Sequence, residues 1–438
     1  TTSATAADSI IVLGNTSIGS GSTFATGSFH HLLGGNFENN GTFTPTTGGN
    51  VTFVGTTAQT ISGSSTTSFD SLCINNSLGV SMASNVNVNN VLGFSGGLLS
   101  VGSNTLGING TIFNASGYIE VSSVSSLSFG GTSAITINDN LFSGDATINN
   151  LTINRSGGVT LGNESMTVNG TVNLAAGTFI IEANTLSMAG NSPTRTSGNI
   201  DVSNAAALIE FTNTSAITLP AYVFNGNVNN MTINGTGGVT AGSDITMNGI
   251  LNLQSANPSS IKGSLDMSNN TLIMGADATT IGIGDVIGIV KRSHTFNIAQ
   301  DYDFGNQFTT LNFLGVSGST LPNWISCKIE IGNAPSWRSV GVRRFYSFAQ
   351  DGGDDRVTSK LHYLDSELNV SETDESKLLF WSGYFGPTFE NAVIGGKSIN
   401  DENDNWIELQ GMPIDLLALS ALDSKQLGLS YTNISTIT

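Results

Sequence analysis

The chain has 438 residues, of which 53 are glycine and 11% are charged, and its formal net charge is −18. This acidic balance argues against nucleic-acid binding and against electrostatic docking on anionic lipid, because both need clustered lysine and arginine. No apolar run reaches the ~18 residues that a membrane-spanning helix needs. We therefore expect no nucleic-acid partner and no membrane insertion.

The first residues, "TTSATAADSIIVLG", join a small-residue stretch to a β-branched run. The chain starts at Thr1 rather than Met, so we expect an extracellular or cell-surface protein from which a signal peptide has been removed. A terminal strand without a local partner can pair with a neighbouring subunit. We therefore predict residues 1–28 as a cap or donor strand, with subunit-interface candidates Ile10, Ile11, Val12 and Leu13.

The phrase "NNLTINRSGGVT", from Asn149, returns almost unchanged as "NNMTINGTGGVT" from Asn229, and a looser copy begins at Phe69. Leu72, Leu151 and Met231 hold equivalent positions, which indicates about three units of roughly 80 residues. Within each unit, apolar–polar–apolar triplets alternate with Gly or Asn. This pattern is typical of short strands joined by tight corners.

These features predict an all-β fold that begins with a parallel β-solenoid over residues 1–288, in coils of ~20–24 residues. Each coil would bury its apolar residues against the next coil. The alternative is a row of antiparallel β-sandwiches of about 80 residues each. Sandwich strands usually run five or more residues, and the short triplets therefore favour the solenoid.

The stretch "NNGTFTPTTGGNVTFVGTTAQTISGSSTTSFDSLCINN", from Asn39, resembles the β-strand-repeat surface proteins of Bacteroidota-type bacteria. The similarity covers most of residues 30–275. It implies an exported protein, often by the type IX route, that acts as an adhesin, filament or matrix component. The sequence shows no typical C-terminal sorting domain for that route.

Composition changes near residue 290, after which eleven of the 14 basic residues and all four tryptophans occur. Longer alternating runs follow, including "WISCKIEIG" from Trp324 and "SKLHYLDSELNV" from Ser359. We predict an antiparallel β-sandwich over 289–438 with a C-terminal strand. The string "VGVRRFYSFAQDGGDDRVTSKLHYLDSELNVSETDESKLLFW" with "DNWIELQG" looks like a domain that accompanies the same surface repeats, and it implies no catalytic role.

The sequence offers little for catalysis. A polysaccharide-active solenoid needs paired carboxylates on adjacent coils, whereas Glu164, Glu182 and Asp201 are isolated. His30 and His31 have no cysteine or acidic cluster beside them and favour a surface role over a metal site. We predict no catalytic and no cofactor-binding residues.

Two acidic loops have oxygen ligands at short spacing, as Ca²⁺ prefers, although neither matches an EF-hand. Solvated loops remain the favoured interpretation, with Ca²⁺ as the one possible cofactor. The candidate ligands are Asp351, Asp354, Asp355, Asp401, Glu402 and Asp404.

The two cysteines, Cys73 and Cys327, lie in different predicted domains. We expect them to stay unpaired as buried or half-buried small side chains.

The last residues, "LGLSYTNISTIT", alternate like a strand and add the interface candidates Leu429, Tyr431 and Ile434. A head-to-tail contact between copies does not close, so it produces a filament. The sequence thus predicts a secreted, non-enzymatic structural protein that self-assembles by strand exchange into an extracellular filament, sheath or surface layer. The alternatives are an adhesin stalk with a sandwich that binds surface glycans through tryptophan, and a polysaccharide-active enzyme.

Overall fold

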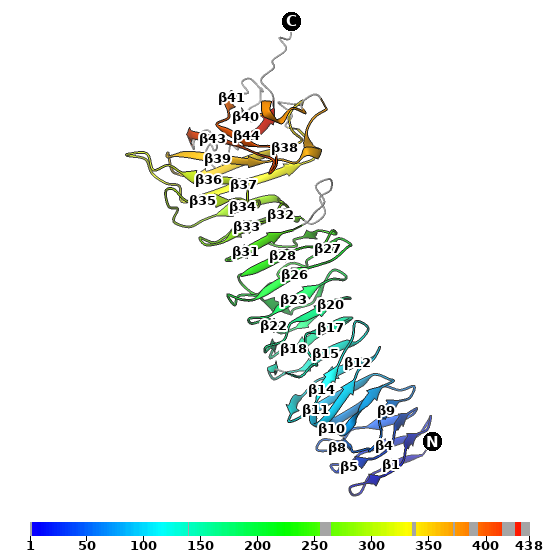
Figure 1. Cartoon of the computed structure of the whole chain (residues 1–438). Coiled ribbons are helices and arrows are strands. Elements are labelled where there is room, and N and C mark those ends of the chain that lie inside the picture. The colour runs from blue at the N-terminus through cyan, green and yellow to red at the C-terminus, as the bar shows by residue number, and fades with distance from the viewer. Residues whose placement is uncertain are drawn as a thin grey trace. The chain divides into compact units, whose positions relative to one another are not determined.

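The computed structural model describes residues 2–138, 140–254, 264–334, 339–370, 373–384, 393–413 and 425–430. It confirms the predicted fold class: a parallel β-solenoid of about 13 turns comes first and antiparallel sheets follow (Figure 1). The helices that it describes are two 3-10 turns, η1 (Asp365–Glu367) and η2 (Glu375–Lys377). Within the described residues, no helix has the length and apolar character needed to cross a membrane.

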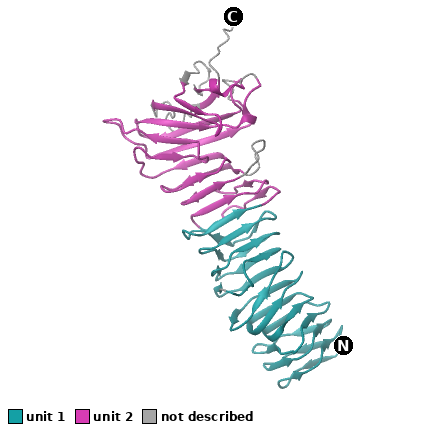
Figure 2. Cartoon of the chain, viewed as in Figure 1, with its two compact units in different colours: residues 1–212, 223–225 teal, residues 213–222, 226–438 magenta. Residues whose placement is uncertain are grey.

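The chain divides into two compact units (Figure 2). Unit 1 comprises residues 1–212 and 223–225, and unit 2 comprises residues 213–222 and 226–438. This division lies inside the solenoid, whereas the sequence places a domain boundary at residue 288. The change of architecture does occur near that residue, at β34 (Val286–Arg292), which pairs in parallel with β32 (Leu265–Met274) and antiparallel with β37 (Trp324–Ile331).

Unit 1 is built from short strands that pair in parallel with the strands of the following coil. Ser3 pairs with Thr23, Val51 with Leu72 and Leu127 with Leu151, so the coil length is 20, 21 and 24 residues at these points. These registers confirm the predicted coil length. The strands of unit 1 are β1 (Ser3–Thr5), β2 (Ile11–Val12), β3 (Thr16–Ile18), β4 (Thr23–Ala25), β5 (His30–Leu33), β6 (Phe37–Asn39), β7 (Thr42–Thr44), β8 (Asn50–Phe53), β9 (Gln59–Ser62), β10 (Thr67–Met82), β11 (Val86–Ser100), β12 (Thr105–Ile108), β13 (Thr111–Asn114), β14 (Tyr118–Glu120), β15 (Ser126–Gly131), β16 (Ile135–Ile137), β17 (Ala146–Ile148), β18 (Asn150–Arg155), β19 (Val159–Leu161), β20 (Met166–Val168), β21 (Val172–Ala176), β22 (Thr178–Ile180), β23 (Thr185–Met188), β24 (Thr194–Arg195), β25 (Asn199–Asp201) and β26 (Leu208–Phe211).

The core of unit 1 follows from the alternation along each strand. In β18, Leu151 and Ile153 are fully buried while Thr152 between them is half-buried. Because side chains alternate across a strand, the apolar members of each triplet line the interior and the polar members face outward. The structure therefore explains the triplet pattern of the sequence as one buried face per strand.

The 80-residue repeat does not stack on itself. Val51 pairs with Leu72, in the middle of the long strand β10. The equivalent pair, Leu127 and Leu151, belongs to a different column of paired strands, which runs from Val86 of β11 through β12 to β15 and β18. Successive copies of the phrase therefore begin on different faces of the coil. Equivalent strand-and-corner units therefore recur about every 80 residues, but this spacing does not correspond to a whole number of coil turns.

A buried cation in unit 1, Arg155, is satisfied by backbone carbonyls of neighbouring coils. Arg155 is 1% exposed, and its guanidinium donates to the carbonyls of Gly110 at 2.8 Å and Asn109 at 3.2 Å, and to that of Gly130. Burial lowers the pKa of Arg155. These carbonyls give the buried cation its hydrogen-bond acceptors, as a buried charge requires.

Unit 2 starts with parallel coils and ends in two antiparallel sheets. One sheet continues from β34 in the order β37, β38, β44, β40, β41, and the other has the order β35, β36, β39, β43, β42. The remaining strands of unit 2 are β27 (Ile217–Thr218), β28 (Asn230–Ile233), β29 (Val239–Thr240), β30 (Ile245–Met247), β31 (Ile250–Leu253), β33 (Thr279–Ile281), β35 (Asp301–Asp303), β36 (Thr310–Phe313), β38 (Arg344–Asp351), β39 (Arg356–His362), β40 (Leu379–Tyr384), β41 (Val393–Gly396), β42 (Ile399–Asp401), β43 (Trp406–Pro413) and β44 (Lys425–Ser430).

The two antiparallel sheets face each other as in a sandwich. Phe304, just after β35, meets Phe348 of β38 edge to face at a ring-centroid distance of 6.1 Å. The Tyr346 hydroxyl of β38 donates to the carbonyl of His362 at the end of β39. The run from Ser359, expected as one strand, stops at His362 because the chain then turns into η1.

A buried ion cluster joins the last parallel coil of unit 2 to its sandwich. The guanidinium of Arg344, 1% exposed, donates to both carboxylate oxygens of Asp285 at 2.8 and 2.7 Å. It also donates to both oxygens of Glu367, at 2.8 and 3.0 Å. Asp285 precedes β34, Arg344 begins β38 and Glu367 lies in η1, so one side chain ties three segments together. Such fork-to-fork pairs are strong and geometrically specific.

This cluster predicts acid sensitivity. Burial alone would raise the pKa of the Asp285 carboxyl, but Arg344 and His362 beside it hold that pKa far below its usual range. A depressed pKa in the folded state contributes stability that is present above the unfolded pKa of about 3.9 and is lost as the pH falls. We expect the free energy of unfolding to decrease more steeply below about pH 4 in the wild type than in Asp285→Asn. Urea titrations at stepped pH measure this, and equal slopes for both proteins would contradict it.

Candidate functional site: the open end of the first coil

The first coil has a free edge on all three of its strands. Within the described residues, β1 pairs only with β4, β2 only with β5, and β3 only with β6. Ile10 and Val12 turn their carbonyls toward β5, where Leu32 and Gly34 donate to them. The backbone groups of Ile11 therefore point away from the coil stack, as alternation along a parallel strand requires.

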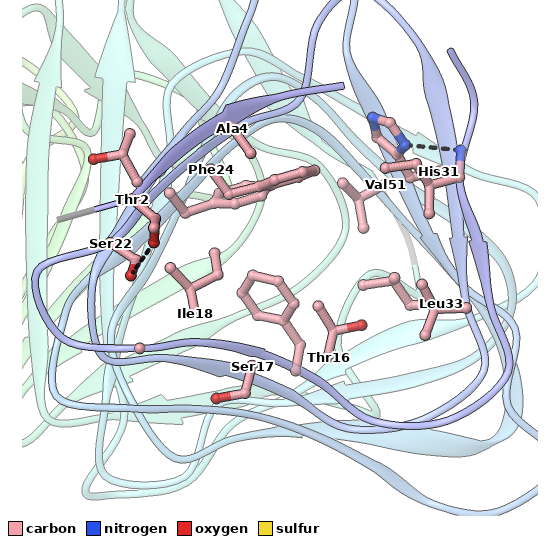
Figure 3. Close-up of a pocket in the computed structure, with 16 residues that line it drawn as sticks. Thr2, Ala4, Thr16, Ser17, Ile18, Ser22, Phe24, His31, Leu33 and Val51 are labelled. Carbon is pink, nitrogen blue, oxygen red and sulfur yellow. Dashed lines mark hydrogen bonds between the residues drawn. The ribbon is translucent and has the colours of Figure 1, made fainter. Parts of the chain in front are cut away.

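Between these edges lies an apolar cavity of about 390 Å³. Figure 3 shows Ile18, Phe24, Leu33 and Val51 converging on it from different sides of the coil. Ile10, just before β2, and Val12 of β2 also line it. The apolar residues of later coils, such as Leu151 and Ile153, are fully buried, whereas the apolar residues of the first coil line an open cavity.

The outer face of the β2 segment is also apolar. Ile11 is 67% exposed and Leu13 is 84% exposed, while the half-buried Leu32 lies beside Ile11 in β5. On the other side of Leu32, one coil later, the paired residue is Thr52. The row of residues that starts at Ile11 therefore becomes polar away from the open end. Apolar side chains thus lie on both faces of the strand at the open edge.

His31 closes one wall of the cavity. Its Nδ1 accepts from the Ile10 N–H at 3.2 Å and its Nε2 donates to the Thr26 carbonyl at 2.8 Å. His30 is exposed and its Nε2 lies 2.7 Å from the Thr52 hydroxyl. Neighbouring residues of a strand point to opposite sides, so the two rings cannot converge on one metal.

The structure places the predicted interface residues in different environments. Residues 10–13 do lie at the open edge, but residues 1–28 are not a free donor strand, because β1, β2 and β3 each pair within the chain. Leu429, expected at the interface, is instead 2% exposed in β44, which pairs with β38 and β40. Tyr431 and Ile434 lie outside the described residues.

The first acidic loop is occupied by hydrogen bonds within the chain. The carboxylate of Asp355, fully buried, accepts from the Gly315 N–H at 2.7 Å and the Val316 N–H at 2.8 Å. Asp354 accepts from Thr320 at 2.7 Å, and Asp351 from the Asn323 amide at 3.2 Å. Their oxygens hold the 314–323 segment in place.

The second acidic loop is a local turn. Asp401 accepts from the backbone N–H groups of Asn403 at 2.9 Å and Asp404 at 3.2 Å, and Glu402 accepts from the Asn400 amide at 3.2 Å. Among the described residues, no group of three or more His, Cys, Asp or Glu side chains forms a candidate metal site. Ca²⁺ at either loop stays a prediction without structural support.

The three tryptophans that the structure describes have different surroundings. Trp381 is 3% exposed, and its ring N–H donates to the Ser430 carbonyl at 3.1 Å. Trp324 and Trp406 are half-buried, and each carries a lysine over one ring face, Lys291 at 4.5 Å and Lys360 at 4.0 Å. Trp337 lies outside the described residues.

A polar cleft of about 640 Å³ opens at one corner of unit 1, and the sequence did not predict it. Asp145, Glu164 and Tyr118, which come from successive coils, line it. Glu164 is 8% exposed, and Asp145 accepts from the Ser165 N–H at 3.1 Å. Only the registers of irregular corners bring these residues together, and their sequence spacing gave no signal.

Both cysteines are free thiols, as expected. Cys73 is half-buried beside Ser95, and Cys327 is fully buried in β37, where burial raises the pKa of its thiol.

Comparisons with protein-family models, with curated proteins and with solved structures found no match for this chain.

Proposed function

We propose that this chain is a secreted, non-enzymatic structural protein that self-assembles through the open end of its first coil into an extracellular filament, sheath or surface layer. The observation that carries the proposal is the joint presence, at one end of the solenoid, of an apolar cavity and three strand edges that have no partner among the described residues. Exposed strand edges are templates for pairing with another chain. A neighbouring chain that covered this end would provide strand partners for its edges and bury its apolar cavity.

Charge favours the same surface. The chain carries a net charge of −18, so copies repel one another over most of their surface. Residues 2–25 contain a single ionisable side chain, Asp8. Contact at the first coil therefore avoids the repulsion that contact elsewhere would meet.

The proposal predicts that a charge at the open edge weakens assembly. In Leu13→Asp, docking would desolvate an uncompensated carboxylate, which costs more than the ~1.4 kcal/mol that corresponds to a tenfold change in affinity. We expect the concentration for half-maximal assembly, measured by light scattering and negative-stain electron microscopy, to rise at least about tenfold.

The matched control is Leu78→Asp, which adds the same charge at a leucine that is 61% exposed on β10, away from the open end. It should assemble like the wild type. Single particles at every concentration of the wild type, or equal assembly of the two variants, would contradict the proposal.

A further inference from the structure

We propose that the occupant of the open end is the C-terminal segment, residues 431–438, of a second copy of this chain. This inference rests on the proposed function and specifies the contact. The segment reads "YTNISTIT" and would add to the free edge of β2 as an extra strand. Adding a strand in this way gains backbone hydrogen bonds along the edge and side-chain contacts on both faces.

The absence of charge in this segment favours it as the occupant. Residues 426–438 contain no Asp, Glu, Lys or Arg, in a chain that carries 32 acidic residues. Residues 2–25 contain only Asp8. The segment can therefore enter a poorly hydrated apolar end without burying a charge, which would be costly.

The apolar residues of the segment match the two faces of the open edge. In a strand formed by residues 431–438, Tyr431 and Ile437 lie on one face and Ile434 lies on the other. The edge of β2 needs this arrangement, because Ile10 and Val12 line the cavity while Ile11 and Leu13 are exposed on the outer face. Tyr431 and Ile437 would fill the cavity, and Ile434 would cover Leu13.

The end of strand β44 fixes where the donor segment can begin. β44 ends at Ser430 and is paired on both edges, with β38 and β40. Its residues are committed to the sandwich, so a donor segment must begin after Ser430. Because the segment and its receptor are different surfaces, the contact is heterologous, and a heterologous contact whose rotation does not close yields a filament.

The experiment is a site-directed cross-link in the full chain. Leu13→Cys and Ile434→Cys are combined in a Cys73→Ser background, because Cys73 is half-buried while Cys327 is fully buried. A short bis-maleimide is added at a concentration where the wild type assembles. We expect a ladder of dimers, trimers and larger products on a denaturing gel, and no ladder from either single variant.

The other outcomes separate this inference from the proposed function. A dimer formed by Leu13→Cys alone would mean that two first coils meet, and a link within one chain would mean that the segment folds back. Either result overturns the inference, as does assembly without any cross-link, while self-assembly itself stands. Absence of assembly by light scattering would overturn the proposed function and the inference with it.

The variant Ile434→Asp provides a second readout. It should raise the concentration for half-maximal assembly at least about tenfold, while leaving the unfolding midpoint of dilute, unassembled protein unchanged. Assembly like that of the wild type would overturn the inference.

Discussion

Replacing Arg344 by methionine is expected to lower the free energy of unfolding by about 3–5 kcal/mol. The substitution leaves Asp285 and Glu367 buried together without the guanidinium that donates four hydrogen bonds to their carboxylates. Removing one partner of a buried ion cluster costs more than the cluster contributes, because the remaining charges cannot be solvated. Urea unfolding followed by fluorescence measures the change.

A matched control lies on the neighbouring strand. Lys328 pairs with Glu330 at 3.0 Å, but the two side chains are 44% and 39% exposed. Lys328→Met removes a cation from a solvated pair and should change stability by less than about 1 kcal/mol. If Arg344→Met and Lys328→Met had equal effects, the cluster would not hold the sandwich to the last coil of unit 2.

Replacing Phe69 by alanine should destabilise the first coils of unit 1 by about 3–5 kcal/mol. Phe69 is fully buried, and its ring lies 5.3 Å from that of Phe43, 6.0 Å from Phe37 and 6.4 Å from Phe53. The substitution removes the ring and leaves a cavity among side chains that are fixed to separate coils. Thermal and urea unfolding, together with hydrogen exchange in β5 to β9, would report the loss.

The control is Phe113→Ala, at a phenylalanine that is 61% exposed on β13. It should change stability by less than about 0.5 kcal/mol, as surface substitutions usually do. A loss from Phe69→Ala of less than about 1 kcal/mol would mean that this end of the solenoid is not held by its aromatic core.

Local pattern was enough to predict the fold class. Triplets such as Leu151-Thr152-Ile153 identify strands with one buried face, and Gly and Asn corners fix the coil length. What the sequence could not supply is register. Asp285 and Arg344 are separated by 59 residues in the chain, and their contact depends on how β34 meets the antiparallel sheet.

The candidate site shows the same limit. The apolar run at residues 10–13 indicates an interface, but its role depends on whether β2 finds a partner within the chain. The structure pairs Ile11 with Leu32, one coil later, which makes the run an acceptor edge rather than a free strand. Leu429 has the same apolar signal but is 2% exposed, in a strand, β44, that pairs with β38 and β40.

The most direct test of assembly through the first coil is hydrogen exchange at its outer edge, measured below and above the concentration at which particles assemble. The amides of Ile11 and Ser17 lie in strands β2 and β3, each paired on one side only, and alternation points these amides outward. We expect both amides to exchange rapidly in single particles and to become protected on assembly. Assembled particles in which these amides still exchange rapidly would contradict this expectation.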